Sequence, residues 1–389
     1  MNTVQRILVI LSLVVLAGVV LTTMPADVLA ADTGDIGQTA SALFGKNLDI
    51  WFMLMLVAFL MMFIKKYEWG VALAVLLSAA GSYIAYLAIQ QFVFGEEIIT
   101  QAMMVRAVIC SITLVIAIGV FLGTVKSWQY LMVGLLFAPV YAFVEWFMAN
   151  PDIIGAAAAD PGGSILVHMC AAYFGLGVAM AIRDKRAFDA PMHTTTHSVT
   201  FVWLASMLLW MLWPSFVTAG LTDSADVQLG TLTCFMAGIG SVISAYAVCM
   251  IVEKKVNPLT YTYALLAGPV AIGATMLIVD PWGALLVGLI AGAVSALCFI
   301  YLQPRLCKMI GVLDVMGVHN LHGMGGWVGV ILSCVILGTF TNLFFAACVV
   351  GITLVAGAAI GLLARFTRGK MDIIMDDDPD FIKNEEPAA

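Results

Sequence analysis

The chain has 389 residues, of which 62% are hydrophobic and only 11% are charged, and its formal net charge is −7. Charged residues make up about a quarter of a typical soluble domain, so this composition excludes an ordinary soluble protein and indicates a polytopic membrane protein. The eight cysteines lack the paired spacing typical of a metal site or a disulfide framework. We therefore expect no metal and no cofactor. Since the sequence shows no nucleophile–base constellation either, we do not expect an enzyme.

Residues 1–30 have the pattern of a cleavable signal peptide. Arg6 gives a short basic start, an apolar run extends from Ile7 to Val20, and small residues mark a boundary before Ala31. The alternative, an additional uncleaved helix, stays open. We expect a transmembrane domain over residues 31–371. Residues 372–389 are expected to form an acidic cytoplasmic tail that is solvated, although contact with a regulator is an alternative.

Eleven further segments are apolar over about the 20 residues that a membrane-spanning helix needs. They cover residues 48–64, 69–91, 102–124, 127–149, 164–182, 197–219, 228–252, 260–279, 282–303, 318–338 and 342–364. The predicted fold class is therefore an all-α polytopic membrane protein with eleven transmembrane helices.

Basic residues fall on every second loop between these segments, which assigns that side to the cytoplasm. They are Lys65, Lys66, Lys126, Arg183, Lys185, Arg186, Lys254, Lys255, Arg305, Lys308, Arg365, Arg368 and Lys370. The opposite loops carry acidic residues and almost no basic ones. This pattern predicts a mature N-terminus outside the plasma (inner) membrane and a C-terminus in the cytoplasm.

A D-x7-H pattern occurs twice, once from Asp160 to His168 and once from Asp314 to His322. The first copy lies on the fifth predicted span and the second on the tenth. Spans one to five and six to ten each hold an odd number of crossings, so two related halves would be inverted, with an additional helix at the C-terminus. Eight helical residues advance about 12 Å. The two imidazoles, entering from opposite faces, should therefore meet near the middle of a roughly 30 Å hydrocarbon layer.

The aspartates and histidines of the two copies have different expected roles. Asp160 followed by Pro161 is the N-cap and N1 combination that begins a helix, and we expect Asp314 to begin its helix in the same way. Histidines inside a membrane usually mark a transport path or a proton relay, whereas the alternative is a hydrogen bond between helices. His319 is a rival to His322 for the second position, but only His322 preserves the eight-residue step.

The sequences around these residues resemble the ammonium transporter and Rhesus-glycoprotein superfamily, and specifically its Rh branch. The matching strings are GGSILVHMCAAYFGL at 162–176, LWMLWPSF at 209–216, GVHNLHGM at 317–324 and GVFLGTVKSWQY at 119–130. This resemblance implies a homotrimer of eleven-span subunits in which each subunit holds its own pore. It implies no nucleic-acid partner, and ammonia or ammonium as the substrate.

The resemblance also implies roles for single residues. His168 and His322 match the two pore histidines of the family, with Asp314 and His319 beside the second one, and Phe216 matches a phenylalanine of the outer gate. This chain departs from the family at the outer mouth. The departures are Met148 and Gly220, which stand near positions where the ammonium transporter branch has tryptophan and serine, and Val217, where Rh proteins usually have asparagine. They argue against an external site of high ammonium affinity.

The implied function is an ammonia channel. A bare ion loses tens of kcal/mol of hydration in a dry, low-dielectric pore, so we expect NH4+ to lose a proton near Phe216 and Asp160. Neutral NH3 then passes His168 and His322 and is protonated again in the cytoplasm. Burial disfavours imidazolium, so both histidines should be neutral. A proton-coupled, electrogenic ammonium transporter, a carbon dioxide channel and a sensor remain as alternatives.

Overall fold

The computed structural model describes residues 36–64, 66–189, 195–372 and 374–381. Every regular element within these ranges is a helix. The chain divides into a unit of residues 1–42 and a unit of residues 43–389, and the second unit contains the helices from residue 43 onwards. The signal peptide expected at residues 1–30 lies outside the described residues.

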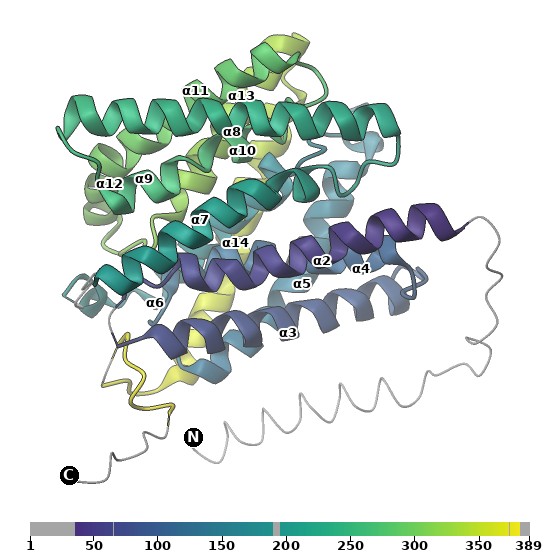
Figure 1. The fold of residues 1–389 in the computed structure, drawn as a ribbon. Helices are drawn as coiled ribbons and strands as arrows, with labels where there is room; N and C mark the ends of the chain where they lie inside the picture. Colours follow the sequence, from purple (N-terminus) through teal and green to yellow (C-terminus); the bar gives the residue numbers. More distant parts are fainter. Residues whose placement is uncertain (1–35, 65, 190–194, 373, 382–389) are drawn as a thin grey trace. The chain divides into compact units, whose positions relative to one another are not determined.

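The helices follow one another along the chain with short connections (Figure 1). The long helices are α2 (Ile36–Leu60), α3 (Glu68–Phe92), α4 (Gln101–Phe121), α5 (Ser127–Ala149), α6 (Cys170–Ile182), α7 (Thr196–Val217), α8 (Ser224–Val252), α11 (Pro281–Leu297), α13 (Met324–Leu337) and α14 (Thr341–Arg368). The shorter ones are α9 (Pro258–Ala264), α10 (Ala267–Ile272), α12 (Gln303–Ile310) and five segments of other helix types, η1 (Pro151–Ile153), η2 (Ser164–Met169), η3 (Lys185–Phe188), η4 (Cys298–Leu302) and η5 (His319–Gly323).

Ten stretches of the described residues are long and apolar enough to cross a membrane. They coincide with ten of the eleven predicted spans and support a multi-pass membrane protein. The apolar segment predicted at residues 260–279 is interrupted in the structure, where it consists of α9 and α10 followed by turns. Pro269 lies in α10, and a proline inside a helix removes a backbone donor and clashes with the preceding turn.

Ser164 forms hydrogen bonds with backbone groups of the irregular segment that results from this break. Its hydroxyl donates to the carbonyl of Val270 at 2.7 Å and accepts from the amide of Ala274 at 2.9 Å. Irregular backbone at membrane depth is tolerated where protein groups of this kind replace the missing hydrogen bonds. The break therefore lies directly against the start of η2, the segment that carries His168.

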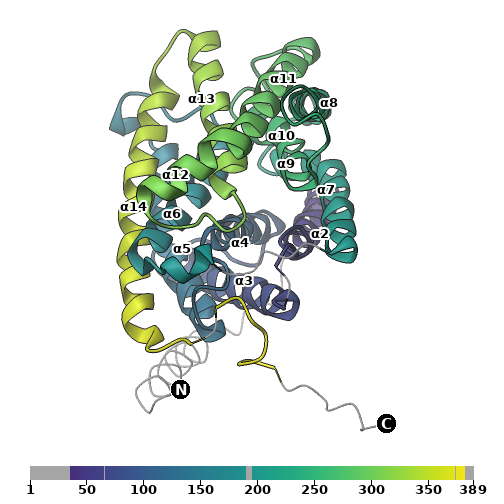
Figure 2. The same ribbon diagram turned by 90° about the vertical axis from the view of Figure 1, so that its left-hand side faces the viewer.

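The most enclosed spans are α4 and the η2–α6 span, in which 83% and 78% of the most apolar 18-residue stretch is buried. Around them the closest helix pairs are α3 with α5, α6 with α14, and α8 with α11. Figure 2 shows α4 in the interior, with α3, α7 and α8 towards one side and α14 towards the other. The D-x7-H motif at Asp160–His168 therefore lies at the entrance of an interior span.

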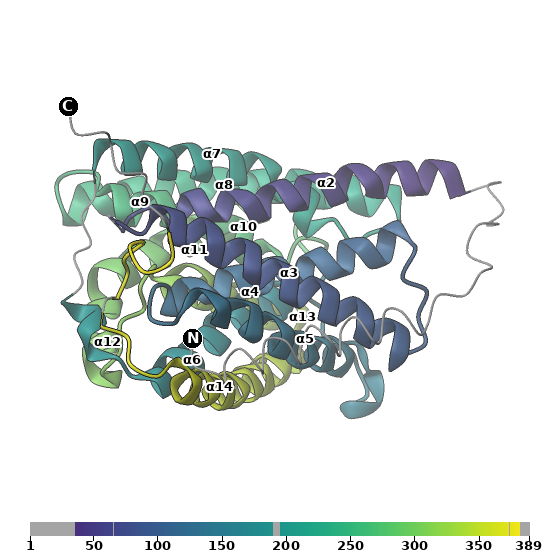
Figure 3. The same ribbon diagram turned by 90° about the horizontal axis from the view of Figure 1, so that it is seen from below.

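The acidic tail was expected to be solvated, but Met375 and Asp377 are buried, whereas residues 378–380 are exposed. The carboxylate of Asp377 accepts from the amides of Trp69 at 3.1 Å and Gly70 at 2.6 Å, at the first turn of α3. Figure 3 shows the C-terminal segment beside the start of α3. Met375 is 4% exposed, and the ring of Phe381 lies 5.4 Å from that of Trp69. A carboxylate at a helix N-terminus meets unpaired N–H groups and the positive end of the helix dipole, which explains why an acidic segment binds there.

The C-terminal end of α14 is attached by Arg368. Its guanidinium donates to the carbonyl of Thr124 at 2.6 Å and forms an ion pair with Asp184 at 3.0 Å. Asp184 also accepts from Arg186 at 2.7 Å. The hydrogen bond from Arg186 is the main reason why the pKa of the Asp184 carboxyl lies below its usual range, and the charge of Arg368 adds to it.

Candidate functional site

Each D-x7-H motif begins with an aspartate whose carboxylate binds the first free amides of a helix. Asp160 Oδ2 accepts from the amides of Ile165 and Leu166 at 2.8 and 2.9 Å. The two carboxylate oxygens of Asp314 accept from the amides of Val318 and His319 at 3.0 and 2.9 Å. Both aspartates therefore serve the helix starts as expected. The expected starting point at Pro161 is wrong, however, because η2 begins at Ser164, and Asp160 reaches it across a short turn.

A glycine three residues after each aspartate makes this turn. Gly163 has a φ of +81° and Gly317 a φ of +66°, values in the left-handed region that glycine adopts without the cost of a Cβ atom. The carbonyl of Gly163 accepts from the amide of His168 at 3.1 Å, and that of Gly317 accepts from Leu321 at 3.4 Å. The repeated pattern is therefore D-x2-G-x4-H. Each glycine forms the turn that brings the following helix start within hydrogen-bonding distance of the aspartate.

Both histidines lie in π-helical segments, η2 and η5, that lead into α6 and α13. A π-helix has a wider turn than an α-helix and is uncommon except as single turns, which are frequent at functional sites. Composition did not indicate these segments, and they change which way each imidazole faces. The same unusual element at the same place in both halves accords with the inverted repeat predicted from the sequence.

The two imidazoles are in direct contact. His322 Nδ1 lies 3.1 Å from His168 Nδ1, and the rings are stacked with centroids 5.0 Å apart. Both side chains are buried, with exposed fractions of 1% for His168 and 7% for His322. A hydrogen bond between two Nδ1 atoms requires one of them to carry a proton and the other to lack it. The two neutral rings are therefore opposite tautomers, so one Nε2 is an acceptor and the other a donor.

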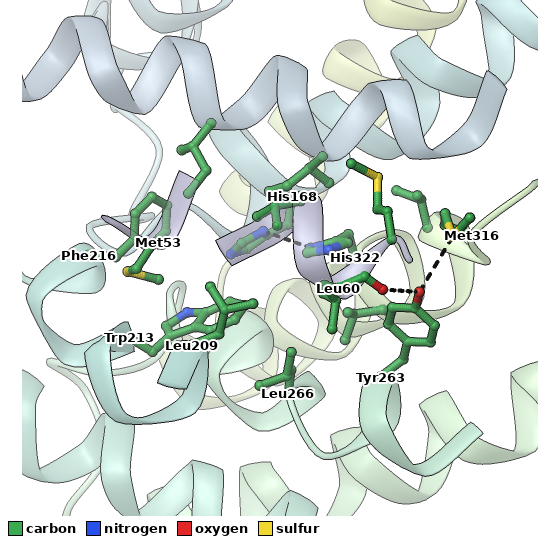
Figure 4. A pocket seen from close by; sticks show the side chains of 16 residues that line it. Met53, Leu60, His168, Leu209, Trp213, Phe216, Tyr263, Leu266, Met316 and His322 are labelled. Atoms are coloured by element: carbon green, nitrogen blue, oxygen red, sulfur yellow. Dashed lines mark hydrogen bonds between the residues drawn. The ribbon is translucent and has the colours of Figure 1, made fainter. Parts of the chain in front are cut away.

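A narrow cavity of about 40 Å³ runs along these rings. A site for one water needs about 10–15 Å³, so the cavity has room for roughly three molecules of that size. Figure 4 shows Phe216 and Met53 at one end, the histidine pair in the middle, and Met316 with Tyr263 at the other end. The remaining lining residues are Val57, Leu60, Met61, Ile112, Ile116, Leu209, Trp213, Leu266, Val318 and Leu321. The lining is almost wholly apolar apart from the imidazoles.

Phe216 and Trp213 cover the His168 end of this cavity. Their rings lie 5.8 and 5.7 Å from the imidazole of His168. The turn after Asp160 reaches the same end, since a Cβ on Gly162 would lie 3.1 Å from Val217. Asp160 itself does not line the cavity. Its Oδ1 atom is buried without a hydrogen-bond partner among the described residues.

His319 occupies a different environment from His322. Its ring packs edge-on against Tyr173 at 5.6 Å, with Nε2 3.4 Å from the tyrosine hydroxyl, which accepts from Trp327 Nε1 at 2.6 Å. It does not line the cavity. The structure therefore pairs His322, and not His319, with His168.

Several lining residues were missed by sequence reasoning. No phenylalanine partner for Phe216 was evident near residues 109 and 110 of the third span, and α4 instead lines the cavity with Ile112 and Ile116. Trp213 lies three residues before Phe216, the spacing of one helix face, so this tryptophan could have been found from the sequence. Aliphatic residues that line a pore have no such signal, because they resemble residues that pack in a core.

No group of three or more metal-ligating side chains occurs within the described ranges.

Spanning helices around a narrow apolar cavity with two facing imidazoles are typical of a membrane transport protein. The family model described as the Ammonium Transporter Family matches residues 12–367, and the chain belongs to this family. It is 33% identical to the ammonium transporter Rh type C of Xenopus laevis over 299 residues, 74% of this chain and 62% of that protein. It is 32% identical to the Rh type A transporter of Bos taurus over 284 residues, 70% of this chain and 65% of that protein.

These alignments span less than two thirds of the length of either relative. Among solved structures, Rh50 of Nitrosomonas europaea superimposes with a TM-score of 0.85 at 29% identity, over 90% of this chain and 93% of that chain. Mep2 of Candida albicans superimposes with a TM-score of 0.71 at 16% identity, over 86% of each chain. The similarity to Mep2 concerns the fold alone. The similarities to Rh50 and to the two Rh transporters assign the chain to the Rh side of the family.

Proposed function

We propose that this protein is a channel that conducts ammonia across a membrane past His168 and His322. The observation that supports this most directly is the contact of two buried imidazoles, with Nδ1 atoms 3.1 Å apart, inside an apolar cavity. The similarity to proteins named ammonium transporters and to a structure titled for conduction by the Rhesus family is consistent with it. The cavity offers one Nε2 donor and one Nε2 acceptor, which suit a small neutral molecule that both donates and accepts hydrogen bonds.

In this proposal NH4+ gives up its proton to water at the outer mouth before it enters the cavity, and the NH3 that leaves takes a proton from water on the other side. Phe216 separates the cavity from the outer mouth, and Asp160 lies behind the neighbouring turn, so these residues define the zone of deprotonation. Neutral NH3 passes the two Nε2 atoms and leaves beside Met316, where it is protonated again. Asp160 and Asp314 hold the starts of η2 and η5 in place, and Asp160 has no separate acid–base step in this scheme.

The membrane setting and the assembly belong to the same proposal. We place the protein in the plasma (inner) membrane with the mature N-terminus outside and the C-terminus in the cytoplasm, because of the basic residues on alternate loops. The assembly is a homotrimer with one conduction path in each subunit, and residues 1–30 are a signal peptide. These assignments rest on the sequence pattern and on the resemblance to the Rh branch.

The test is a stopped-flow measurement of internal pH in proteoliposomes exposed to an ammonium gradient. The variant with both His168→Ala and His322→Ala loses the two hydrogen bonds to ammonia, worth about 1–2 kcal/mol of barrier. Its flux should fall about 5- to 30-fold. His197→Ala removes an exposed histidine on α7 and serves as the matched control. A double variant that transports at the wild-type rate would overturn the assignment.

The same vesicles separate this function from its alternatives. Currents on a solid-supported membrane after an ammonium pulse would favour a proton-coupled transporter in place of neutral conduction. Parallel gradients of methylammonium and carbon dioxide report the substrate range. A pH change with ammonium, without a transported charge, is the expected result.

A further inference from the structure

Two charged side chains extend the pore-lining stripe of α2 beyond the cavity. Met53, Val57 and Leu60 of this helix line the cavity, at intervals of four and three residues that share one helix face. The same intervals carried towards the N-terminus reach Asp49 and Lys46. Seven residues of helix advance about 10.5 Å, so Lys46 lies about that far beyond Met53, on the Phe216 side of the cavity.

Both side chains bind the turn of α7 that carries Phe216. Lys46 Nζ donates to the carbonyl of Thr218 at 2.6 Å, and the carboxylate of Asp49 accepts from Ser215 Oγ at 2.6 Å. Ser215 directly precedes Phe216, and Thr218 follows it by two residues. A fixed cation and a fixed anion therefore flank the aromatic entrance, and the cation stands one helical turn further out.

The charge of Lys46 is not neutralised by a contacting carboxylate. None of the ion pairs found among the described residues involves Lys46, and its known partner is a neutral carbonyl. The contact with Lys46 holds its ammonium group at the Thr218 carbonyl, and the contact with Ser215 holds the Asp49 carboxylate beside Phe216. An ammonium ion that arrives from this side thus meets the fixed ammonium group of Lys46 before it reaches Phe216.

We propose that Lys46 is a specificity-determining residue, a fixed positive charge at the outer mouth that repels NH4+ and other cations and leaves the entry of neutral NH3 unaffected. Asp49 acts in the opposite sense, since it attracts cations towards Phe216 and partly compensates Lys46. This inference rests on the proposed function, because it concerns the mouth of the same conduction path.

The expected size follows from Coulomb's law. Two unit charges about 10 Å apart interact by an energy equivalent to roughly 2- to 15-fold in occupancy when the effective dielectric constant lies between 80 and 20. Removal of the Lys46 charge should therefore lower the half-saturating ammonium concentration by about 2- to 15-fold. Removal of the Asp49 charge should raise it by a similar factor.

The experiment compares proteoliposomes of wild type, Lys46→Gln, Lys46→Arg and Asp49→Asn, with ammonium titrated at constant pH. Glutamine can still donate to the Thr218 carbonyl but has no charge, while arginine keeps the charge. We expect Lys46→Gln to lower the half-saturating concentration, Lys46→Arg to stay within about twofold of wild type, and Asp49→Asn to raise it. A contact that only holds helices together would shift Lys46→Gln and Asp49→Asn in the same direction.

Two outcomes are distinguishable. If wild-type vesicles change pH no faster than protein-free vesicles, the proposed function fails and this inference fails with it. If wild-type vesicles conduct ammonia and Lys46→Gln has the wild-type half-saturation, or shifts together with Asp49→Asn, only the inference about Lys46 is overturned. If Lys46→Gln does not reach the membrane in folded form, the half-saturating concentration of Asp49→Asn decides. A value no higher than that of wild type overturns the proposal.

Discussion

Alanine at either motif glycine should destabilise the protein more than alanine at a glycine with the same backbone conformation elsewhere. Gly163 and Gly317 combine a positive φ with crowding. A Cβ on Gly163 would lie 2.9 Å from Val167 Cγ2, and one on Gly317 would overlap the ring of Phe299. Gly155 at φ +79° and Gly338 at φ +66° have open space around the same position, so they are matched controls.

The loss of stability on a Gly→Ala change has one part that all four positions share and one part that only the two motif glycines have. Left-handed backbone costs a residue with a Cβ about 1–2 kcal/mol, and this part is common to all four positions. The reduced entropy of the unfolded chain returns about 0.4–1 kcal/mol on a Gly→Ala change. Crowding adds about 1–3 kcal/mol at Gly163 and Gly317 only. The difference between a motif glycine and its control is therefore the crowding part alone.

Thermal unfolding in detergent, followed by tryptophan fluorescence, measures this difference. For a chain of 389 residues, with about 2.1 cal/mol/K of unfolding entropy per residue, 1 kcal/mol corresponds to about 1 °C, so Gly163→Ala should melt about 1–4 °C below Gly155→Ala. Gly317→Ala and Gly338→Ala should differ in the same way. Phe299→Leu, combined with Gly317→Ala, should restore part of the loss by making space. Equal melting temperatures within each pair would refute the claim that these turns are sterically closed.

Two further predictions concern the contacts around the C-terminal end of α14 and the tail that follows it. Asp377→Asn removes the charged acceptor of the Trp69 and Gly70 amides, so it should lower the free energy of unfolding by about 1–3 kcal/mol and expose the tail to protease. Asp372→Asn, at an exposed position, should do neither. Equal digestion rates of the two variants would count against a bound tail. The pKa of Asp184 lies below its usual range because of Arg186 and Arg368, so its stabilisation is complete above the unfolded value of about 3.9 and is lost as the pH falls through the lowered value. Melting curves between about pH 5 and 2.5 should therefore show a fall in wild type that is smaller in Asp184→Asn, and parallel curves would contradict this.

The sequence alone led to the histidine pair because two simple regularities coincide. The equal spacing from Asp160 to His168 and from Asp314 to His322 predicted equal depths, and an odd number of spans in each half predicted opposite directions of entry. These two facts predict that the rings lie at similar depths, and the structure brings them into contact. The choice of His322 over His319 also followed from spacing, and the structure places His319 against Tyr173.

Other features could not be read from the chain because tertiary contacts decide them. Hydropathy does not distinguish residues 260–279 from a continuous helix, since the broken backbone there is stabilised by Ser164 from a distant segment. The π-helices at η2 and η5 have no composition signal. The tail of residues 374–381 looked solvated because it is acidic, but the amides at the start of α3 bind Asp377. For the broken span and for the tail, the missing information was a partner more than 100 residues away.

The polar groups of the cavity favour ammonia over ammonium on hydrogen-bond counting as well as on charge. The Nδ1 contact between His168 and His322 leaves one Nε2 lone pair and one Nε2–H on the two rings. Ammonium has four N–H donors and no acceptor, so one of its donors would find a partner and the Nε2–H would face a cation. Ammonia, with a lone pair and three N–H groups, satisfies both Nε2 atoms at once. The tautomer pair thus adds a hydrogen-bond preference for the neutral species to the cost, tens of kcal/mol, of stripping the ion of water in an apolar cavity.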